Sequence, residues 1–351
     1  MKDFGRLDDV DAAIVNALQI NPRLSWARVA QVLQLDAVTV ARRWKRLADA
    51  GAVWVSGHPG PMLAASGQGC MAIVEIDCVN GRLLETAEHL MQQPMVVTVQ
   101  HVTGGRDLMV TVIAPSFDAM SRWITGVLGS LSGVTAGRTH LVTAIHTHGS
   151  RWRLHALPSD RAAQFAAVNQ VRRVGELRMS ALDRELMVAL SVDGRASYTD
   201  LATRCGVSVD TARRRTTHLI DSGAVLLRCD IAKPLTERPI TVVLWAEIPS
   251  HALKPAAQAV AGHRDVRLCA GIAGRHNLLI IAWVRSTDDI QRFETRLTQL
   301  APGIVIGDRS VVLSSLKING HLVDEDGYRI GSVAIDPWKT AVAEHDSRTE
   351  R

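Results

Sequence analysis

The chain has few cysteines and no apolar run long enough to cross a membrane. Its 351 residues include five cysteines, namely Cys70, Cys78, Cys205, Cys229 and Cys269. An odd number with no Cys-x-x-Cys spacing excludes a disulfide scaffold and a zinc knuckle. The longest apolar runs, such as residues 278–284, have the length of a strand, and the first residues hold no apolar signal core. We therefore expect a cytoplasmic protein with no membrane partner.

The sequence also lacks the common signatures of catalysis and of cofactor binding. It contains no Gly-x-Ser-x-Gly elbow, no Walker A loop, no His-Glu-x-x-His and no Gly-x-Gly-x-x-Gly after an expected strand. His146 and His148 stand two residues apart, but no cysteine or acidic third ligand is near them in the sequence. We therefore expect no catalytic residues, no metal and no cofactor.

What the chain does have is a large apolar share and a mild excess of positive charge. Apolar residues make up 47% of the chain, which is enough for several hydrophobic cores. The 40 Lys and Arg exceed the 35 Asp and Glu, giving a net charge of +5. This balance permits a nucleic-acid partner without requiring one. Basic residues exceed acidic ones in residues 1–56 and 151–230, whereas the reverse holds in residues 57–150.

The chain contains an internal duplication. Residues 10–53 align without a gap to residues 182–225, and both segments end in Gly-Ala-Val. Other identical pairs are Asp11/Asp183, Arg23/Arg195, Ser25/Ser197, Thr39/Thr211, Arg42/Arg214 and Arg43/Arg215. A second match relates the remainder of each half and pairs Gly104 with Gly274. The chain therefore has the order A-B-A′-B′, in which each unit occurs twice.

The repeated A unit is predicted to be three short helices followed by a short strand. Apolar residues recur at helical spacing, and an Asn-Pro or Asp-Gly pair ends the first helix. Ser25 and Ser197 are N-cap candidates for the second helix. Gly51 and Gly223 follow the third helix, where a left-handed residue belongs. The short turn before the third helix is typical of a helix-turn-helix (HTH) unit.

The third helix of each A unit carries the residues expected to bind DNA. Val40, Trp44 and Leu47 form one apolar stripe, and the Arg and Thr residues lie off it. Such a helix fits a major groove, where Arg can read guanine and Ser or Thr can hold phosphates. The candidate DNA-binding residues are Ser25, Thr39, Arg42, Arg43, Arg46, Ser197, Thr211, Arg214, Arg215 and His218.

A solvated basic face is the alternative interpretation of these helices. A single basic helix would favour it, but Thr-x-x-Arg-Arg recurs after the same turn in both copies. The repetition favours DNA binding. The second unit has a weaker apolar stripe, with Thr216 where the first has Trp44. We expect the second unit to contact the DNA backbone more than the bases.

The B unit has the strand and helix order βαββαβ, which is typical of a ferredoxin-like domain. The first copy predicts strands at 70–76, 95–102, 107–114 and 134–146 and helices at 82–92 and 116–129. The second copy predicts strands at 240–248, 265–272, 277–285 and 304–317 and helices at 251–262 and 287–300.

The repeats set the domain boundaries. The two A units span residues 1–56 and 179–228, and the two B units span residues 68–149 and 238–319. We expect a structured connector at 150–178, with helix at Ala162–Val174, and an irregular tail at 320–351 with an acidic patch at Asp324-Glu325-Asp326.

The motifs of the A unit resemble those of the Lrp/AsnC family of transcription regulators. The matching residues are the Asp11–Leu18 helix, Asn21-Pro22-Arg23-Leu24-Ser25, Arg42-Arg43 and, in the second copy, Asp193-Gly194-Arg195-Ala196-Ser197. The B unit resembles the family's effector domain, which is called RAM. The resemblance covers most of the chain and implies the α+β class, with two winged-type HTH units and two ferredoxin-like βαββαβ (RAM) units, arranged HTH-RAM-HTH-RAM.

The resemblance also implies partners. Family members form homo-oligomers, bind palindrome-like double-stranded DNA and respond to an amino acid or a related small metabolite. The family's effector loop carries Gly-x-x-Asp, which Gly104 and Asp107 match; the second copy has Gly274 and Asn277 and so lacks the charge that would anchor an ammonium. A tight turn alone would also explain these residues. Because one chain holds two copies, we expect an intramolecular pseudo-dimer and an imperfect palindrome with unlike half-sites.

Two other functions remain open. Siroheme decarboxylases resemble this architecture, and Arg275 and His276 stand at the loop where an anionic tetrapyrrole would need them. That family's His-x-Leu-Asn-x-Trp stretch is not reproduced here. The third possibility is a metabolite sensor whose HTH units serve assembly only. A tetrapyrrole absorption band would favour the decarboxylase, and the lack of any salt-dependent DNA affinity would favour the sensor.

Overall fold

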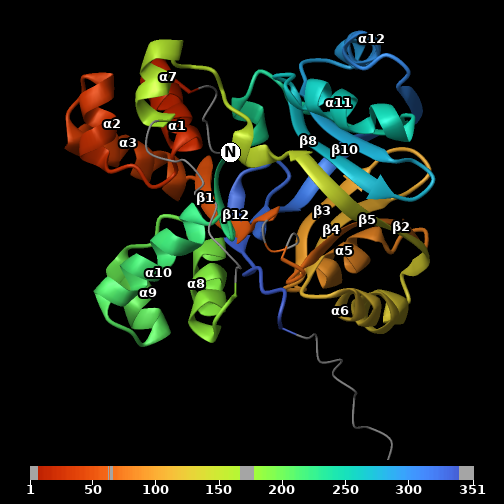
Figure 1. Cartoon of the computed structure of the whole chain (residues 1–351), viewed down its shortest axis with the longest axis horizontal. Helices are drawn as coiled ribbons and strands as arrows, with labels where there is room; N and C mark the ends of the chain where they lie inside the picture. Colours follow the sequence, from red (N-terminus) through yellow and green to blue (C-terminus); the bar gives the residue numbers. More distant parts are fainter. Residues whose placement is uncertain (1–6, 62, 64–65, 167–177, 340–351) are drawn as a thin grey trace, which may run out of the picture.

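The computed structural model describes residues 7–61, 63, 66–166 and 178–339. Two helical units lie on one side of the molecule, and a body of strands and helices lies on the other (Figure 1). Each half of the chain supplies one helical unit and half of this body. The predicted α+β class and the order HTH-RAM-HTH-RAM are therefore confirmed. No helix within the described residues has the length and apolar character that spanning a bilayer requires.

The two HTH units have the same succession of elements. The first consists of α1 (Asp9–Ile20), α2 (Trp26–Leu33), α3 (Ala37–Asp49) and β1 (Val53–Pro59). The second consists of α8 (Ala181–Val192), α9 (Tyr198–Cys205), α10 (Val209–Asp221) and β6 (Val225–Ile231). Both strands are longer than the short strands that the sequence predicts, because they pair with each other over seven residues.

Local sequence signals begin and end these helices. Each N-cap side chain accepts a hydrogen bond from a backbone N–H of the following turn, which satisfies a group that the helix leaves unpaired. The N-cap residues are Asp8, Ser25, Asp36, Ser180, Ser197 and Ser208. Gly51 and Gly223 both have φ +72° just past the third helices, as predicted.

The two RAM units follow the predicted βαββαβ order. The first has β2 (Cys70–Cys78), α5 (Leu83–Met91), β3 (Val96–Val102), β4 (Leu108–Ala114), α6 (Phe117–Arg122) and β5 (Val134–Thr147). The second has β7 (Ile240–Glu247), α11 (Ser250–Ala261), β8 (Val266–Ala273), β9 (Leu278–Val284), α12 (Asp288–Leu300) and β10 (Val305–Ile318). The helix predicted at 116–129 is regular only in α6; it continues as a π turn at Trp123–Val127.

The strands of the two RAM units form one closed sheet. Its order is β10-β3-β4-β2-β5-β8-β9-β7, and β7 pairs again with β10. The 14-residue strands β5 and β10 close it, because each pairs first within its own unit and then with a strand of the other unit. The predicted intramolecular pseudo-dimer of effector units is thereby confirmed.

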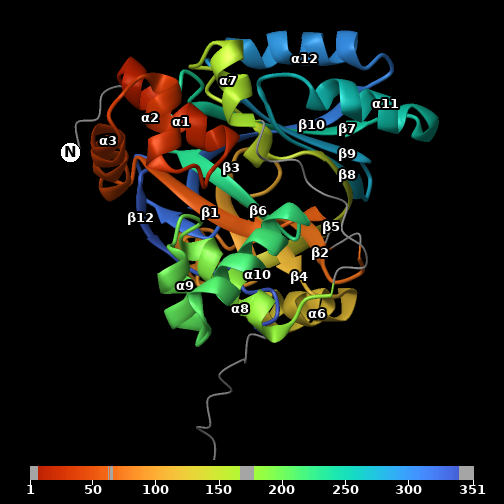
Figure 2. The ribbon, with the colours of Figure 1, turned by 60° about the vertical axis from the view of Figure 1, so that its left-hand side comes forward.

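The closed sheet separates two kinds of core. Helices such as α11 and α12 cover its outside (Figure 2), and alternate side chains of the strands pack against them. The other side chains point inward; they include Ile73, Met109, Val243, Trp245 and Leu279. The interior is not filled throughout, and a cavity remains where the sheet meets β1 and β6.

The chain beyond residue 320 differs from the irregular tail that the sequence predicts. Strands β11 (His321–Val323) and β12 (Arg329–Ser332) form a hairpin that extends the sheet from β10. The hairpin also docks on the first HTH unit, where the Arg329 N–H donates to the Gly51 carbonyl at 2.9 Å. The two strands are only three and four residues long, so the sequence shows no strand pattern there. Their pairing with each other and with β10 stabilises them in place of local strand propensity.

The described part of the connector contains a helix, as predicted. Helix α7 covers Ser159–Ala166, and the rest of the helix predicted at Ala162–Val174 lies outside the described residues. Phe165 is fully buried in the core of the first HTH unit. Part of the connector therefore belongs structurally to that unit.

Candidate DNA interface and ligand cavity

The two HTH units are paired through an antiparallel ribbon of β1 and β6. The register runs from Val53 opposite Ile231 to Pro59 opposite Val225. Its centre places Ser56 opposite Arg228, and these two residues occupy the same position of the duplicated sequence. The pseudo-twofold axis that relates the two units therefore passes between them.

Two equivalent arginines add a second link between the units. Arg23 donates to the carbonyls of Gly194 and Ala196 at 2.8 and 2.9 Å. Arg195 donates to the carbonyl of Leu24 at 3.0 Å and also to that of Pro22. These contacts fix the positions of the third helices, α3 and α10, relative to each other within one chain.

In the described ranges of the chain, some of the arginines on the predicted DNA-binding face of α3 form ion pairs with acidic residues of the same unit, and one does not. Arg43 donates to Asp8 at 2.6 Å and to Asp11 at 2.9 Å, and Arg46 also pairs with the buried Asp11. The hydrogen bonds that Arg43 donates to Asp8 and Asp11 raise its pKa. Arg42 is exposed and has no ion pair among the described residues. Arg42 is therefore the arginine of α3 most available to a ligand such as DNA.

Helix α10 shows the same division. Arg215 pairs with Asp183, with Nε donating to Oδ1 at 2.9 Å, whereas Arg214 is exposed. Burial of Asp183 opposes its charge, but hydrogen bonds from Arg215 and Ser180 outweigh that effect and lower its pKa. His218 is half-buried in the last turn of the helix. The equivalence of Arg42 with Arg214 and of Arg43 with Arg215 extends from sequence to structure.

The other candidate DNA-binding residues lie at the starts of helices. Ser25 and Ser197 cap α2 and α9, so their hydroxyls are already hydrogen-bonded to backbone N–H groups. Thr39 and Thr211 are half-buried in the first turns of α3 and α10. The role of all ten candidates in binding DNA stays a prediction.

The candidate effector loops are engaged in structural contacts. Asp107 accepts a hydrogen bond from the Cys78 N–H at 2.7 Å, and Asn277 exchanges hydrogen bonds with the backbone of Ile248 at 3.0 and 2.7 Å. Gly104 has φ +101°, which favours glycine at the turn. None of the residues predicted to bind effector, Gly104, Asp107, Gly274 and Asn277, lines the cavity between the sheet and the ribbon.

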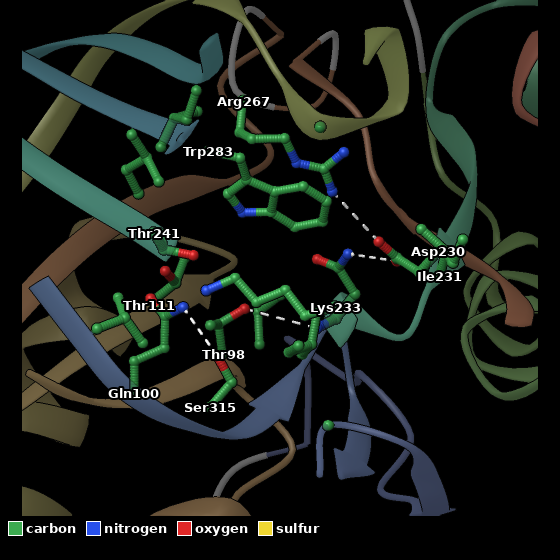
Figure 3. A pocket seen from close by; sticks show the side chains of 18 of the residues that line it. Thr98, Gln100, Thr111, Asp230, Ile231, Lys233, Thr241, Arg267, Trp283 and Ser315 are labelled. Carbon is green, nitrogen blue, oxygen red and sulfur yellow. Dashed lines mark hydrogen bonds and ion pairs between the residues drawn. The ribbon is translucent and has the colours of Figure 1, made fainter. Parts of the chain in front are cut away.

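That cavity has a volume of about 330 Å³ (Figure 3). One side is the interior of the closed sheet, which presents Thr98, Gln100, Thr111, Thr241 and Ser315. The other side is the ribbon, which presents Trp54, Arg228 and Asp230. Ligand pockets of proteins span roughly 300–1,000 Å³ and combine apolar walls with a few placed polar groups. The cavity has the size and composition of a small-molecule site.

Cations predominate in the inner part of the cavity, which we define as the part around Asp230. Asp230 pairs with Arg228 at 2.6 Å and with Arg267 at 3.5 Å, so one carboxylate serves two guanidinium groups. Arg267 also lies against the ring of Trp283, 3.9 Å from its centre. Lys233 points across the cavity toward the side where Gln100 and Thr241 lie (Figure 3). Burial and the charge of Arg267 lower the pKa of Lys233 to about 8.

Sequence reasoning missed these cavity residues. One signal was available, because the duplicated alignment continues past residue 53 and pairs Ser56 with Arg228 and His58 with Asp230. Such differences at otherwise equivalent positions mark places where one copy has acquired a separate role. The signal identifies Arg228 and Asp230 but gives no indication of Arg267 or Lys233.

Comparison with known proteins agrees with the repeated architecture. The chain matches the AsnC-type helix-turn-helix domain over residues 7–48 and 179–220. It matches the Lrp/AsnC ligand binding domain over residues 71–151 and 241–322. Together these segments cover most of the chain.

Individual relatives match either one half or the whole. The HTH-type transcriptional regulator FL11 of Pyrococcus furiosus is 27% identical over 143 residues, which is 40% of this chain and 93% of that protein. The Bkd operon transcriptional regulator of Pseudomonas aeruginosa is 27% identical over 37% of this chain and 87% of its own length. The siroheme decarboxylase NirDL, solved with an iron-uroporphyrin III analogue, has a TM-score of 0.56 at 12% identity and covers 94% of this chain and 96% of its own, a likeness of fold alone.

Proposed function

The chain belongs to the Lrp/AsnC family of DNA-binding transcription regulators, and we propose that it recognises an imperfect palindrome with its two unlike HTH units. The observation that carries this proposal is the fixed pairing of the units through β1, β6 and the reciprocal arginines. Arg42 and Arg214 are exposed at equivalent positions of the two paired units. Paired units of this kind read two half-sites whose spacing follows from the protein's geometry.

Fluorescence anisotropy with a duplex from the chain's own upstream region tests specific binding, with a scrambled duplex as the control. For binding that depends on phosphate contacts, the logarithm of the affinity falls linearly with the logarithm of the salt concentration. Two salt concentrations are therefore compared. Selection from a random pool then gives the operator. Unlike half-sites are the expected result, whereas a perfectly symmetric operator would contradict the proposal that the two units read different sequences.

The small-molecule effector is proposed to be an amino acid or a related metabolite. The Lrp/AsnC ligand binding domain occurs twice in the chain, which supports a ligand-controlled regulator. We further propose that chains associate into homo-oligomers through RAM faces and that the protein works in the cytoplasm, where it meets DNA. Sedimentation with and without amino acids measures the association.

We also propose that the ligand is an effector and not a substrate. The alternative is a tetrapyrrole enzyme, because the NirDL fold extends over nearly the whole chain. The exposed arginines on both third helices support the regulator. The purified protein is scanned for a Soret band, and uroporphyrin III is then added. Retained tetrapyrrole together with no affinity for DNA at low salt would favour the enzyme.

A further inference from the structure

The cavity is placed to receive a ligand that touches both the RAM sheet and the HTH ribbon. Its walls include Thr241 of β7 and Trp283 of β9 on the sheet side. They include Trp54 of β1 and Arg228 of β6 on the ribbon side. A bound molecule would therefore contact the element that pairs the two DNA-binding units.

Positive charge exceeds negative charge in the inner part of the cavity, around Asp230. Arg228, Arg267 and Lys233 face it with Asp230 as their only carboxylate within the inner lining described here. Burying a cation without an equal counter-charge is costly, and a carboxylate ligand would remove that cost. Arginine and lysine together hold a carboxylate through charge-assisted hydrogen bonds. The charge pattern therefore favours an anionic group at the inner end.

Two further donors in the lining have no hydrogen-bond partner within the part of the chain that the structure describes. Thr241 is 2% exposed and its hydroxyl has no hydrogen bond among the described residues. Trp54 is 4% exposed, and its indole N–H is likewise unpaired within the described part of the chain. Buried donors are almost always satisfied in folded proteins, so unpaired donors lining a cavity point to an absent acceptor.

The outer end of the cavity has the opposite charge. The Asp324-Glu325-Asp326 segment between β11 and β12 lines it, and Glu325 and Asp326 are exposed. A molecule with a carboxylate inside and an ammonium outside would match both ends. The apolar part of such a molecule would lie against Trp283 and Ile281.

We propose that this cavity, and not the Gly-x-x-Asp loop, binds the effector, and that the effector is a zwitterion of amino-acid size held by Lys233 and Arg267 at its carboxylate. The proposal deepens the proposed function, because it takes the ligand to be the regulator's effector. Since Trp54, Arg228 and Asp230 belong to β1 and β6, occupancy of the cavity changes the ribbon that fixes the two HTH units.

Binding is measured without DNA, so that its outcome is independent of the DNA-binding proposal. The full chain is titrated calorimetrically with each of the twenty common amino acids. The amino acids that bind are then compared with their carboxamides and with their des-amino acids, for example L-phenylalanine with L-phenylalaninamide and 3-phenylpropionate. At least one amino acid is expected to bind with Kd below about 1 mM, and its carboxamide about tenfold more weakly or worse.

Variants then locate the site. Lys233→Met is expected to weaken binding about tenfold or more, and Lys254→Met, which removes an exposed lysine of α11, is expected to leave it within about twofold. Thr241→Val removes an unpaired buried hydroxyl, so it keeps the fold and weakens binding. Failure of every amino acid to bind at 10 mM would overturn the proposal. Binding that Lys233→Met and Thr241→Val leave unchanged, but that Asp107→Asn abolishes, would place the site at the loop.

Discussion

Arg23 and Arg195 hold the two HTH units together by the same exchange of hydrogen bonds in opposite directions. Each guanidinium donates to two backbone carbonyls of the other unit and lies over one of its aromatic rings. Arg23 is 4.8 Å from the ring centre of Tyr198, and Arg195 is 4.0 Å from that of Trp26. The identity of these two residues in the duplicated sequence thus reflects a shared role in pairing.

Replacing Arg195 with Met is expected to loosen this pairing. The change leaves the carbonyls of Pro22 and Leu24 without their donor and removes the cation over Trp26. Hydrogen bonds to charged groups contribute about 1.5–3 kcal/mol, so we expect a loss of that order in the free energy of unfolding. Urea denaturation measures it. Arg204→Met, at an exposed position of α9, is the matched control and is expected to change stability by less than about 0.5 kcal/mol.

Arg42 and Arg43 are expected to respond differently to replacement by Ala. Arg42→Ala removes an exposed side chain, so it lowers affinity for the selected operator by about 1–3 kcal/mol and leaves the melting temperature unchanged. Arg43→Ala also removes the ion pairs to Asp8 and Asp11, so it lowers the melting temperature as well. Anisotropy and thermal denaturation on the same samples separate the two effects. An unchanged affinity for Arg42→Ala would mean that α3 does not read the operator through this residue.

The helices of the HTH units could be predicted because their signals are local. Ser25 and Gly51 stand where the sequence places them, since a cap acts on backbone groups two or three residues away. The RAM strands were predictable for the same reason. Their apolar residues form runs whose length identifies strands, such as residues 278–284.

The sequence could not predict which arginines form ion pairs within the protein. Arg42 and Arg43 are neighbours of one type on one helix, and only contacts with residues 32 and 35 positions away distinguish them. The cavity likewise depends on contacts between segments that are distant in the sequence, because Arg267 meets Asp230 only when β8 and β6 come together. Sequence periodicity carries no information about such pairs.

Lys317 is expected to make stability rise with pH above neutrality. Its side chain is fully buried in the sheet and donates to the carbonyls of Met91 and Gln93 at 2.7 and 3.2 Å. Burial lowers its pKa from 10.5 to about 7. Between these two values the unfolded chain binds a proton that the folded chain does not bind. Raising the pH from about 7 to 10.5 therefore stabilises the fold, with a slope of at most about 1.4 kcal/mol per pH unit.

Denaturant midpoints from pH 7 to 10 for the wild type and for Lys317→Met measure this contribution. The variant carries no titrating group at this position, so its pH dependence in this range is expected to be flatter than that of the wild type. Equal slopes for the two proteins would show that Lys317 titrates near its ordinary pKa despite its burial.

Asp107→Ala is expected to act on the fold and not on the ligand. Asp107 accepts a hydrogen bond from the Cys78 N–H at the end of β2, so its loss leaves that donor without its partner. The expected cost is about 1–3 kcal/mol in the free energy of unfolding. Affinity for the amino acid that the wild type binds is expected to stay within about twofold, because the cavity does not include this residue. Asp107→Asn keeps an acceptor oxygen and removes the charge, so it is expected to recover most of the stability. A variant with Asn at this position that folds normally and no longer binds the amino acid would instead show that the carboxylate charge anchors the ligand ammonium.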